Sequence, residues 1–167
     1  MSPSVVADTG GLLRALARTK DGQPSFPDYE RVLTSAILVI VPGLILAEVD
    51  YFLRANRAAM RKLVAEIFDP GTRYEFERPL PSDLIRGLEL DAKFKNLELG
   101  LVDGTVAAVA ERRQVYRILT TDRRDFGGGG RVRAGVRPAP PRAHSVPGAF
   151  AGGGTGCRRR RRSRYFS

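Results

Sequence analysis

The chain has 167 residues and a formal net charge of +10 at pH 7, and its length suits one domain with a sizeable core. No apolar run is long enough to cross a bilayer, and the N-terminus lacks the basic and apolar regions of a secretion signal. The one cysteine, Cys157, excludes an intramolecular disulfide and a cysteine-based metal site. We therefore expect a cytoplasmic protein that makes no membrane contact.

The positive charge is concentrated near the C-terminus. Residues 1–126 contain 18 lysines and arginines and all 18 acidic residues, whereas the other basic residues, all arginines, lie in residues 127–167. The balance within 1–126 predicts a neutral globular domain, so the net charge alone does not make that domain a nucleic-acid binder. Residues 127–167 are rich in glycine, proline and arginine, which predicts a disordered tail.

The chain opens with an apolar run, residues 5–7, that ends in Asp8 and is followed by a helical pattern. This arrangement predicts a buried strand with a carboxylate at its C-terminal end, and then a helix from residue 10 or 11 to Arg18. Open α/β sheets expose their chemistry at such strand ends. Asp8 would equally serve as the N-cap of that helix, so a chemical and a structural role both stay open for it.

The next elements alternate between helix and strand. A helix is predicted after residue 25, with Ser25 as its cap and Pro27 in its first turn. Residues 37–41 are aliphatic throughout, which predicts a strand buried on both faces. Residues 57–68 follow the pattern of an amphipathic helix, and residues 73–77 alternate in polarity as an edge strand does.

Glu48 lies in the helix predicted after the second strand. Helical spacing predicts that Leu44, Ala47 and Tyr51 form the buried side of this helix, and Glu48 lies among them. An isolated buried charge is expensive, so this carboxylate requires a partner. That partner is either a metal ion or a nearby arginine such as Arg54.

The acids of the second half fall into two groups. The predicted helix over 81–94 carries acids that we interpret as solvated surface charges without a chemical role: Asp83, Glu89 and Asp91. By contrast, Asp103 is predicted to open an alanine-rich helix, either as its N-cap or as a carboxylate that points into a pocket beside Asp8. Residues 116–121 predict a strand that ends at Asp122, although aspartate is also common there as a turn residue.

Strands that alternate with helices predict a parallel α/β sheet with right-handed crossovers. We expect four carboxylates to converge at the carboxyl edge of this sheet: Asp8, Glu48, Asp103 and Asp122. They would repel one another unless a cation neutralised them. Oxygen ligands without histidine or cysteine favour Mg²⁺ or Mn²⁺, and such an ion can promote phosphodiester hydrolysis. The one histidine, His144, lies in the tail, which leaves no histidine-based ribonuclease mechanism in the domain.

Four segments in this order, residues 5–10, 46–51, 101–104 and 118–126, resemble the PIN domain. More narrowly, they are similar to the VapC ribonuclease toxins of bacterial type II toxin–antitoxin systems. The resemblance implies an α/β fold, a three-layer α/β/α sandwich around a mainly parallel sheet of four or five strands. It also implies a Mg²⁺- or Mn²⁺-dependent endoribonuclease with RNA as its substrate, inhibition by a cognate antitoxin protein, and homodimers.

The resemblance also implies which side chains act. The acids that match the family's catalytic and metal-binding quartet are Asp8, Glu48, Asp103 and Asp122. Asp125 lies in the last motif as a further candidate. Thr9 and Thr121 are candidates for orienting water or phosphate, a role that the sequence does not establish.

The C-terminal part departs from the family, whose sheet usually closes with a short strand after the last motif. Two other functions stay open. A PIN-like fold that no longer cuts RNA would only bind its antitoxin, and the arginine-rich tail could bind nucleic acid non-specifically through phosphates. The triplet Asp8-Thr9-Gly10 is also that of aspartic proteases, but their chemistry needs two such carboxylates and the chain has no second triplet.

Overall fold

A computed structural model describes residues 3–121 and 136–138. In chain order the elements are β1 (Val5–Ala7), α1 (Thr9–Leu16), α2 (Pro27–Ser35), β2 (Val39–Pro42), α3 (Ile45–Phe52), α4 (Arg57–Phe68), β3 (Tyr74–Glu77), α5 (Pro81–Lys93), the 3-10 helix η1 (Lys95–Leu97), α6 (Gly100–Arg113), β4 (Arg117–Leu119) and β5 (Val136–Pro138). None of the helices in these residues is long and apolar enough to span a membrane.

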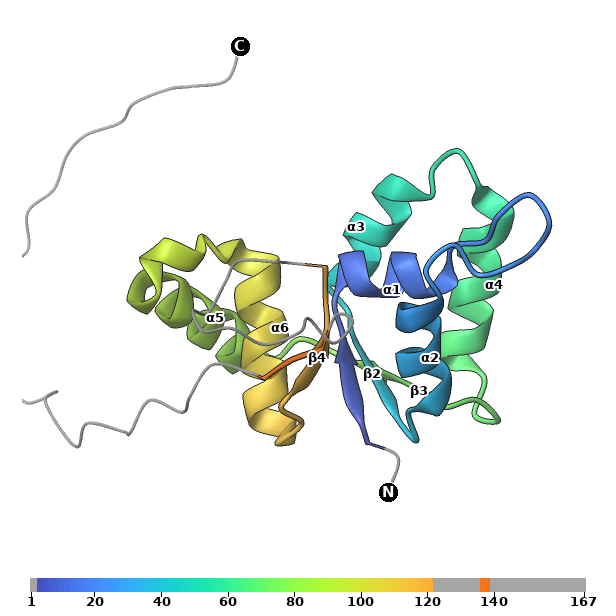
Figure 1. Ribbon diagram of the computed structural model, residues 1–167. Helices are drawn as coiled ribbons and strands as arrows, with labels where there is room; N and C mark the ends of the chain where they lie inside the picture. The colour runs from blue at the N-terminus through green and yellow to red at the C-terminus, as the bar shows by residue number, and fades with distance from the viewer. Residues whose placement is uncertain (1–2, 122–135, 139–167) are drawn as a thin grey trace, which may run out of the picture.

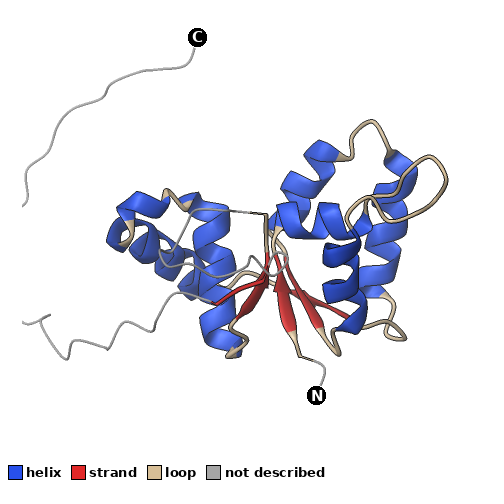
Figure 2. Cartoon of the chain, in the orientation of Figure 1, coloured by secondary structure: helices blue, strands red, loops and turns tan. Residues whose placement is uncertain are grey.

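The strands form one sheet in the order β3-β2-β1-β4-β5. The first four strands of this order are mutually parallel, and β5 pairs antiparallel with β4. Helices α1 to α4 lie on one side of the sheet and α5 and α6 on the other (Figures 1 and 2). The predicted α/β sandwich with a mainly parallel sheet is therefore confirmed, as is the position of β3 at an edge.

The core is built from the two central strands. All three residues of β1 are fully buried, and so are Val39, Ile40 and Val41 of β2. A strand covered by helices on both faces has no wet side, which is why these segments are apolar without alternation. Ile37 was also expected in the buried strand, but β2 begins two residues later and the Ile37 side chain is 66% exposed.

The buried side of α3 differs from the predicted one. Ile45 and Val49 face the core, whereas Ala47 is exposed and Tyr51 is 57% exposed. The helix begins at Ile45 and packs through positions four apart, which turns the predicted apolar side toward solvent. The helix cap predicted at Ser25 was also wrong, because α2 begins at Pro27 after Phe26, which makes no side-chain capping bond.

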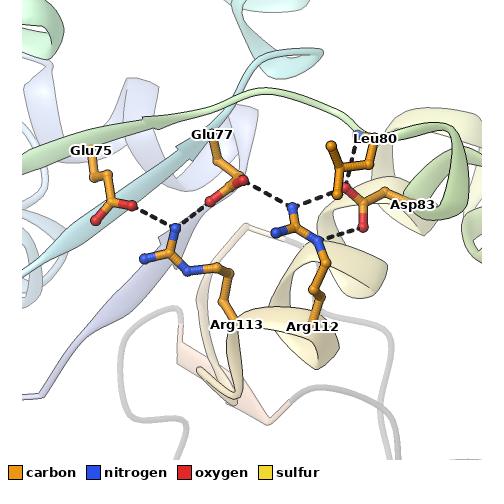
Figure 3. A network of polar contacts seen from close by, with 6 residues as sticks. All are labelled: Glu75, Glu77, Leu80, Asp83, Arg112 and Arg113. Atoms are coloured by element: carbon orange, nitrogen blue, oxygen red, sulfur yellow. Dashed lines mark hydrogen bonds and ion pairs between the residues drawn. The ribbon is translucent and has the colours of Figure 1, made fainter.

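Asp83 is not the solvated charge that the sequence predicted. Its side chain is 3% exposed, accepts a hydrogen bond from the backbone N of Leu80 at 2.9 Å, and pairs with Arg112 Nε at 2.8 Å. Arg112 also reaches Glu77 at 2.9 Å, so it lies between two carboxylates (Figure 3). Its hydrogen bond to Asp83 raises the pKa of Arg112 above its usual value. The charge of Asp83 can be buried here because Arg112 pairs with it.

The same network includes further contacts to β3, the strand at the edge of the sheet. Arg113 contacts Glu75 at 2.5 Å and also contacts Glu77, so the two arginines at the end of α6 join that helix to β3 (Figure 3). The hydrogen bond from Arg113 lowers the pKa of Glu75. We call Glu75, Glu77, Asp83, Arg112 and Arg113 the arginine network.

β5 lies within residues 127–167, the segment that the sequence analysis assigned to the tail. β5 pairs with β4 and closes the sheet on that side, as the short last strand of PIN-like sheets is expected to do. Leu119 of β4 is paired with Val136 of β5. The predicted disorder of the tail otherwise concerns residues outside those that the structure describes.

Candidate functional site

Asp8 follows β1 directly and is half-buried. One carboxylate oxygen, Oδ1, accepts a hydrogen bond from the backbone N of Thr9 at 2.7 Å, so Asp8 caps α1. The other oxygen, Oδ2, accepts a hydrogen bond from Thr120 Oγ1 at 2.7 Å. Of the two roles that the sequence left open for Asp8, the structure therefore shows the capping role, and it places the carboxylate at the carboxyl edge of the sheet.

Glu48 is held by a hydroxyl group and not by an arginine. Its Oε2 accepts a hydrogen bond from Thr9 Oγ1 at 2.6 Å. Within residues 3–121 it makes no ion pair, and Arg54, the expected partner, lies over the ring of Tyr51 instead. The salt bridge to Arg54 considered for Glu48 is thus not formed, and Thr9 connects α3 to the start of α1.

Thr120 is the residue of this cluster that the sequence analysis missed. Thr120 is buried, with 7% exposure, as is Thr9, the other threonine of the cluster, with 5% exposure. The parallel register pairs Ala7 with Leu119, so the next residues, Asp8 and Thr120, lie side by side at the strand ends. The sequence did contain a signal for this contact, because the strands predicted at residues 5–7 and 116–121 are both followed by or end in polar residues. We call Asp8, Thr9, Glu48 and Thr120 the acidic site.

Two glycines allow α1 to start directly against the end of β4. A Cβ atom on Gly11 would lie 2.0 Å from the carbonyl oxygen of Leu119, and one on Gly10 would lie 2.2 Å from Thr121 Oγ1. The first contact is with backbone, which has no room to move, so any larger residue at position 11 would push the helix away from the strand. This close approach keeps Asp8 within reach of Thr120.

Asp103 lies in the first turn of α6 and is exposed. The helix begins at Gly100, in a left-handed conformation with φ 64°, so Asp103 does not open the helix and the N-cap alternative considered for it was wrong. Its neighbour Gly104 packs against the backbone of Gly87 in α5, since a Cβ on Gly104 would lie 2.6 Å from the Gly87 carbonyl oxygen. The crossing of α5 and α6 thus determines where Asp103 lies. Asp122 and Asp125 lie outside the described residues.

The acidic site supplies part of what a divalent cation requires. Carboxylate and hydroxyl oxygens are suitable ligands for Mg²⁺ or Mn²⁺, and two carboxylates share the hydrogen-bonded cluster. In residues 3–121 and 136–138, however, no three acidic, histidine or cysteine side chains are grouped so that they could hold a metal ion. The described residues therefore match the donor type but do not by themselves form a complete ligand set.

The architecture that carries the acidic site is an α/β fold similar to the PIN domain. It is similar to the crystal structure of Mycobacterium tuberculosis VapC20, a sarcin-ricin loop cleaving toxin, with a TM-score of 0.57. The two sequences are 20% identical, and the match covers 72% of this chain and 91% of that one. No protein-family model and no curated protein sequence matches this chain. The likeness shows the fold, and an activity has to be argued from the side chains.

Proposed function

We propose that this protein is a metal-dependent endoribonuclease, the toxin component of a type II toxin–antitoxin system, which hydrolyses RNA phosphodiester bonds. The observation that carries the proposal is the acidic site, in which two carboxylates from separate segments share Thr9 at the carboxyl edge of a parallel sheet. This edge is where open α/β sheets place their sites. The fold likeness to VapC20, a sarcin-ricin loop cleaving toxin, supports the same assignment.

In this proposal Asp8 and Glu48 bind Mg²⁺ or Mn²⁺, together with Asp103 and Asp122. The ion, when bound, activates water and stabilises the charge that develops on the phosphate. Thr9 and Thr120 donate hydrogen bonds from uncharged hydroxyl groups to the two carboxylates, which orient them without adding a positive charge. The proposed partners are an RNA substrate, a cognate antitoxin protein and a second copy of the chain, all in the cytoplasm.

One observation favours a second candidate, a PIN-like module that binds an antitoxin but has lost catalysis. Among the described residues no three acidic side chains form a group that could hold a metal ion, and Asp103 is exposed in the first turn of α6. If Asp122 does not complete the site, no cation will be held tightly. The other alternative, nucleic-acid binding driven by the arginines of the tail, concerns residues outside the described part.

The test is cleavage of RNA by the full chain with EDTA and then with added Mg²⁺ or Mn²⁺. We expect cleavage only with metal, and Asp8→Asn, Glu48→Gln and Asp103→Asn should each lower it by roughly 100-fold. Asparagine is also a good N-cap, so Asp8→Asn should still fold. Asp21→Asn, in an exposed turn, is the matched control and should cleave normally.

Three outcomes separate the candidates. Cleavage in EDTA, or equal cleavage by the variants and the control, would contradict the nuclease proposal. A folded chain that cuts no RNA in the presence of metal would favour the antitoxin-binding module. RNA binding that disappears when Arg158 to Arg162 become glutamine would favour the tail, and these substitutions leave β5 in place, whereas deletion of residues 127–167 would remove it.

A further inference from the structure

Two exposed aromatic side chains end α3. Tyr51 is 57% exposed and Phe52 is 63% exposed. Their ring centroids are 5.7 Å apart and the rings are nearly perpendicular, at 87°. Large rings usually bury most of their surface, so an exposed pair of them indicates a surface that meets a ligand.

This pair lies next to the acidic site. Tyr51 and Phe52 follow Glu48 by three and four positions, so they lie one turn further along the same side of α3. Glu48 itself contacts Thr9 at the start of α1, and α1 and α3 lie beside each other on one face of the sheet (Figure 1). A chain molecule that placed one unit at the acidic site would have its next units near these rings.

A cation completes this surface. The guanidinium carbon of Arg54 lies 4.1 Å from the centroid of the Tyr51 ring, a cation–π distance. In the described part of the chain Arg54 makes no ion pair, in contrast to Arg57, which pairs with Asp50 at 2.6 Å. The charge of Arg54 is therefore held in place by a ring, and no carboxylate in that part of the chain neutralises it.

We propose that Tyr51, Phe52 and Arg54 form a binding surface for single-stranded RNA beside the acidic site. A nucleobase stacks on the exposed Phe52 ring, and Arg54 binds a neighbouring phosphate. Exposed rings next to an arginine are the usual means of binding unpaired nucleotides, since every base has an aromatic face. RNA fits better than an apolar helix, because the exposed rings lie beside a guanidinium group that makes no ion pair in the described residues, since the neighbouring Asp50 pairs with Arg57. This inference rests on the proposed nuclease function for its choice of RNA, and it specifies that the substrate is unpaired.

The test measures base stacking directly. A short single-stranded oligoribonucleotide that contains 2-aminopurine is titrated with the full chain carrying Asp8→Asn, which prevents cleavage during the titration. We expect 2-aminopurine fluorescence to be quenched on binding, because the base stacks on an aromatic ring. Adding Phe52→Ala should remove the quenching and weaken binding by about 5- to 150-fold, the range measured for loss of one stacked base.

Two further variants separate this role from a structural one. Phe52→Tyr keeps a ring and should restore both quenching and affinity. Phe68→Ala removes a phenylalanine of similar exposure, 59%, on α4 and should change neither. Arg54→Gln should weaken binding and reduce its dependence on salt, because a phosphate contact is lost.

The outcomes distinguish this inference from the nuclease proposal. If Phe52→Ala binds the oligonucleotide as well as Phe68→Ala does, or if the chain binds no single-stranded RNA, the inference is overturned even if the protein cleaves RNA. Unchanged RNA binding by Phe52→Ala together with loss of a protein partner would also overturn it. If stacking is lost as expected but the protein never cleaves RNA, the binding surface stands and the nuclease proposal fails.

Discussion

The structure holds its carboxylates in two different ways in two regions. In the arginine network, Asp83 and Glu77 each contact the guanidinium group of an arginine at the end of α6. In the acidic site, the contacts of Asp8 and Glu48 include hydrogen bonds from threonine hydroxyls and a backbone amide. Both regions hold their acids in fixed positions, but the first balances their charges with arginines, whereas Glu48 in the second makes no ion pair within residues 3–121.

The difference indicates what each region is for. An ion pair neutralises an acid and joins two elements, as Arg112 joins α6 to the start of α5 and to β3. A hydroxyl group orients a carboxylate but leaves its negative charge available for a cation. The arginine network is thus suited to hold α6, which carries Asp103, in place, and the acidic site is suited to bind something positive. The following four predictions test this contrast, from the largest expected effect to the smallest.

Gly11→Ala should damage the acidic site through the backbone. The added Cβ would overlap the carbonyl oxygen of Leu119, so α1 must move away from β4, at a cost of about 3 kcal/mol in the free energy of unfolding. Urea denaturation measures this cost. Gly71→Ala is the control, because its Cβ would meet only the exposed side chain of Asp69, at 3.2 Å, and its stability should change by less than about 1 kcal/mol. Equal stability of the two variants would show that the close contact is unimportant.

Arg112→Ala should weaken the arginine network. It leaves the buried carboxylate of Asp83 without its cation, and a fully buried pair broken in this way costs about 3–5 kcal/mol. Since the Arg112 side chain is 32% exposed, we expect about 2 kcal/mol in urea denaturation. Arg31→Ala, which breaks an exposed pair with Asp28, should cost less than about 0.5 kcal/mol. A similar cost for both would mean that burial of Asp83 adds nothing.

Thr9→Val should separate function from stability in the acidic site. Valine has the shape of threonine but cannot donate to Glu48, so the carboxylate loses its orientation while the fold loses about 1 kcal/mol. RNA cleavage should fall roughly tenfold, as expected for a misplaced catalytic group. Thr9→Ser keeps the hydroxyl and should retain most of the activity. If valine and serine give the same cleavage rate, the hydrogen bond to Glu48 has no role in catalysis.

The contact between Glu75 and Arg113 in the arginine network should make the free energy of unfolding depend on pH. Because the hydrogen bond from Arg113 lowers the pKa of Glu75 below its ordinary value of 4.5, the unfolded chain takes up a proton there before the folded chain does. This contribution to stability is complete above pH 4.5 and is lost as the pH falls through the pKa of the folded state. Glu75 is 43% exposed, so the effect should stay below about 1 kcal/mol.

Thermal or urea unfolding followed from pH 7 to pH 3 measures this dependence. Glu75→Gln cannot titrate, so its stability should fall less steeply below pH 4.5 than that of the unchanged chain. Asp21→Asn, in an exposed turn outside the network, is the control and should leave the slope unchanged. Identical slopes for all three proteins would remove Glu75 from the acid sensitivity of the fold.

The order and type of the main elements could be predicted from the sequence, because they depend on local hydrophobic patterns. The four parallel strands lie where apolar or alternating runs predict them, within a few residues. Asp8 at the end of the first strand is part of the same local signal, since a strand that ends in an acid just before a helix needs no distant partner to be recognised. The placement of Glu48 on α3 was predictable for the same reason.

Which side chains meet was decided by the tertiary structure. Asp83 was predicted to be solvated, and it is buried because Arg112, 29 positions later, packs onto it. Thr120 donates to Asp8 across 112 positions of sequence, through a strand register that no local pattern contains. The sequence by itself thus determined the strands, the helices and the acids at their ends. Only the packing of the chain decided which acids contact arginines and which contact hydroxyl groups, because a side chain's partner depends on distances in space and not on spacing along the chain.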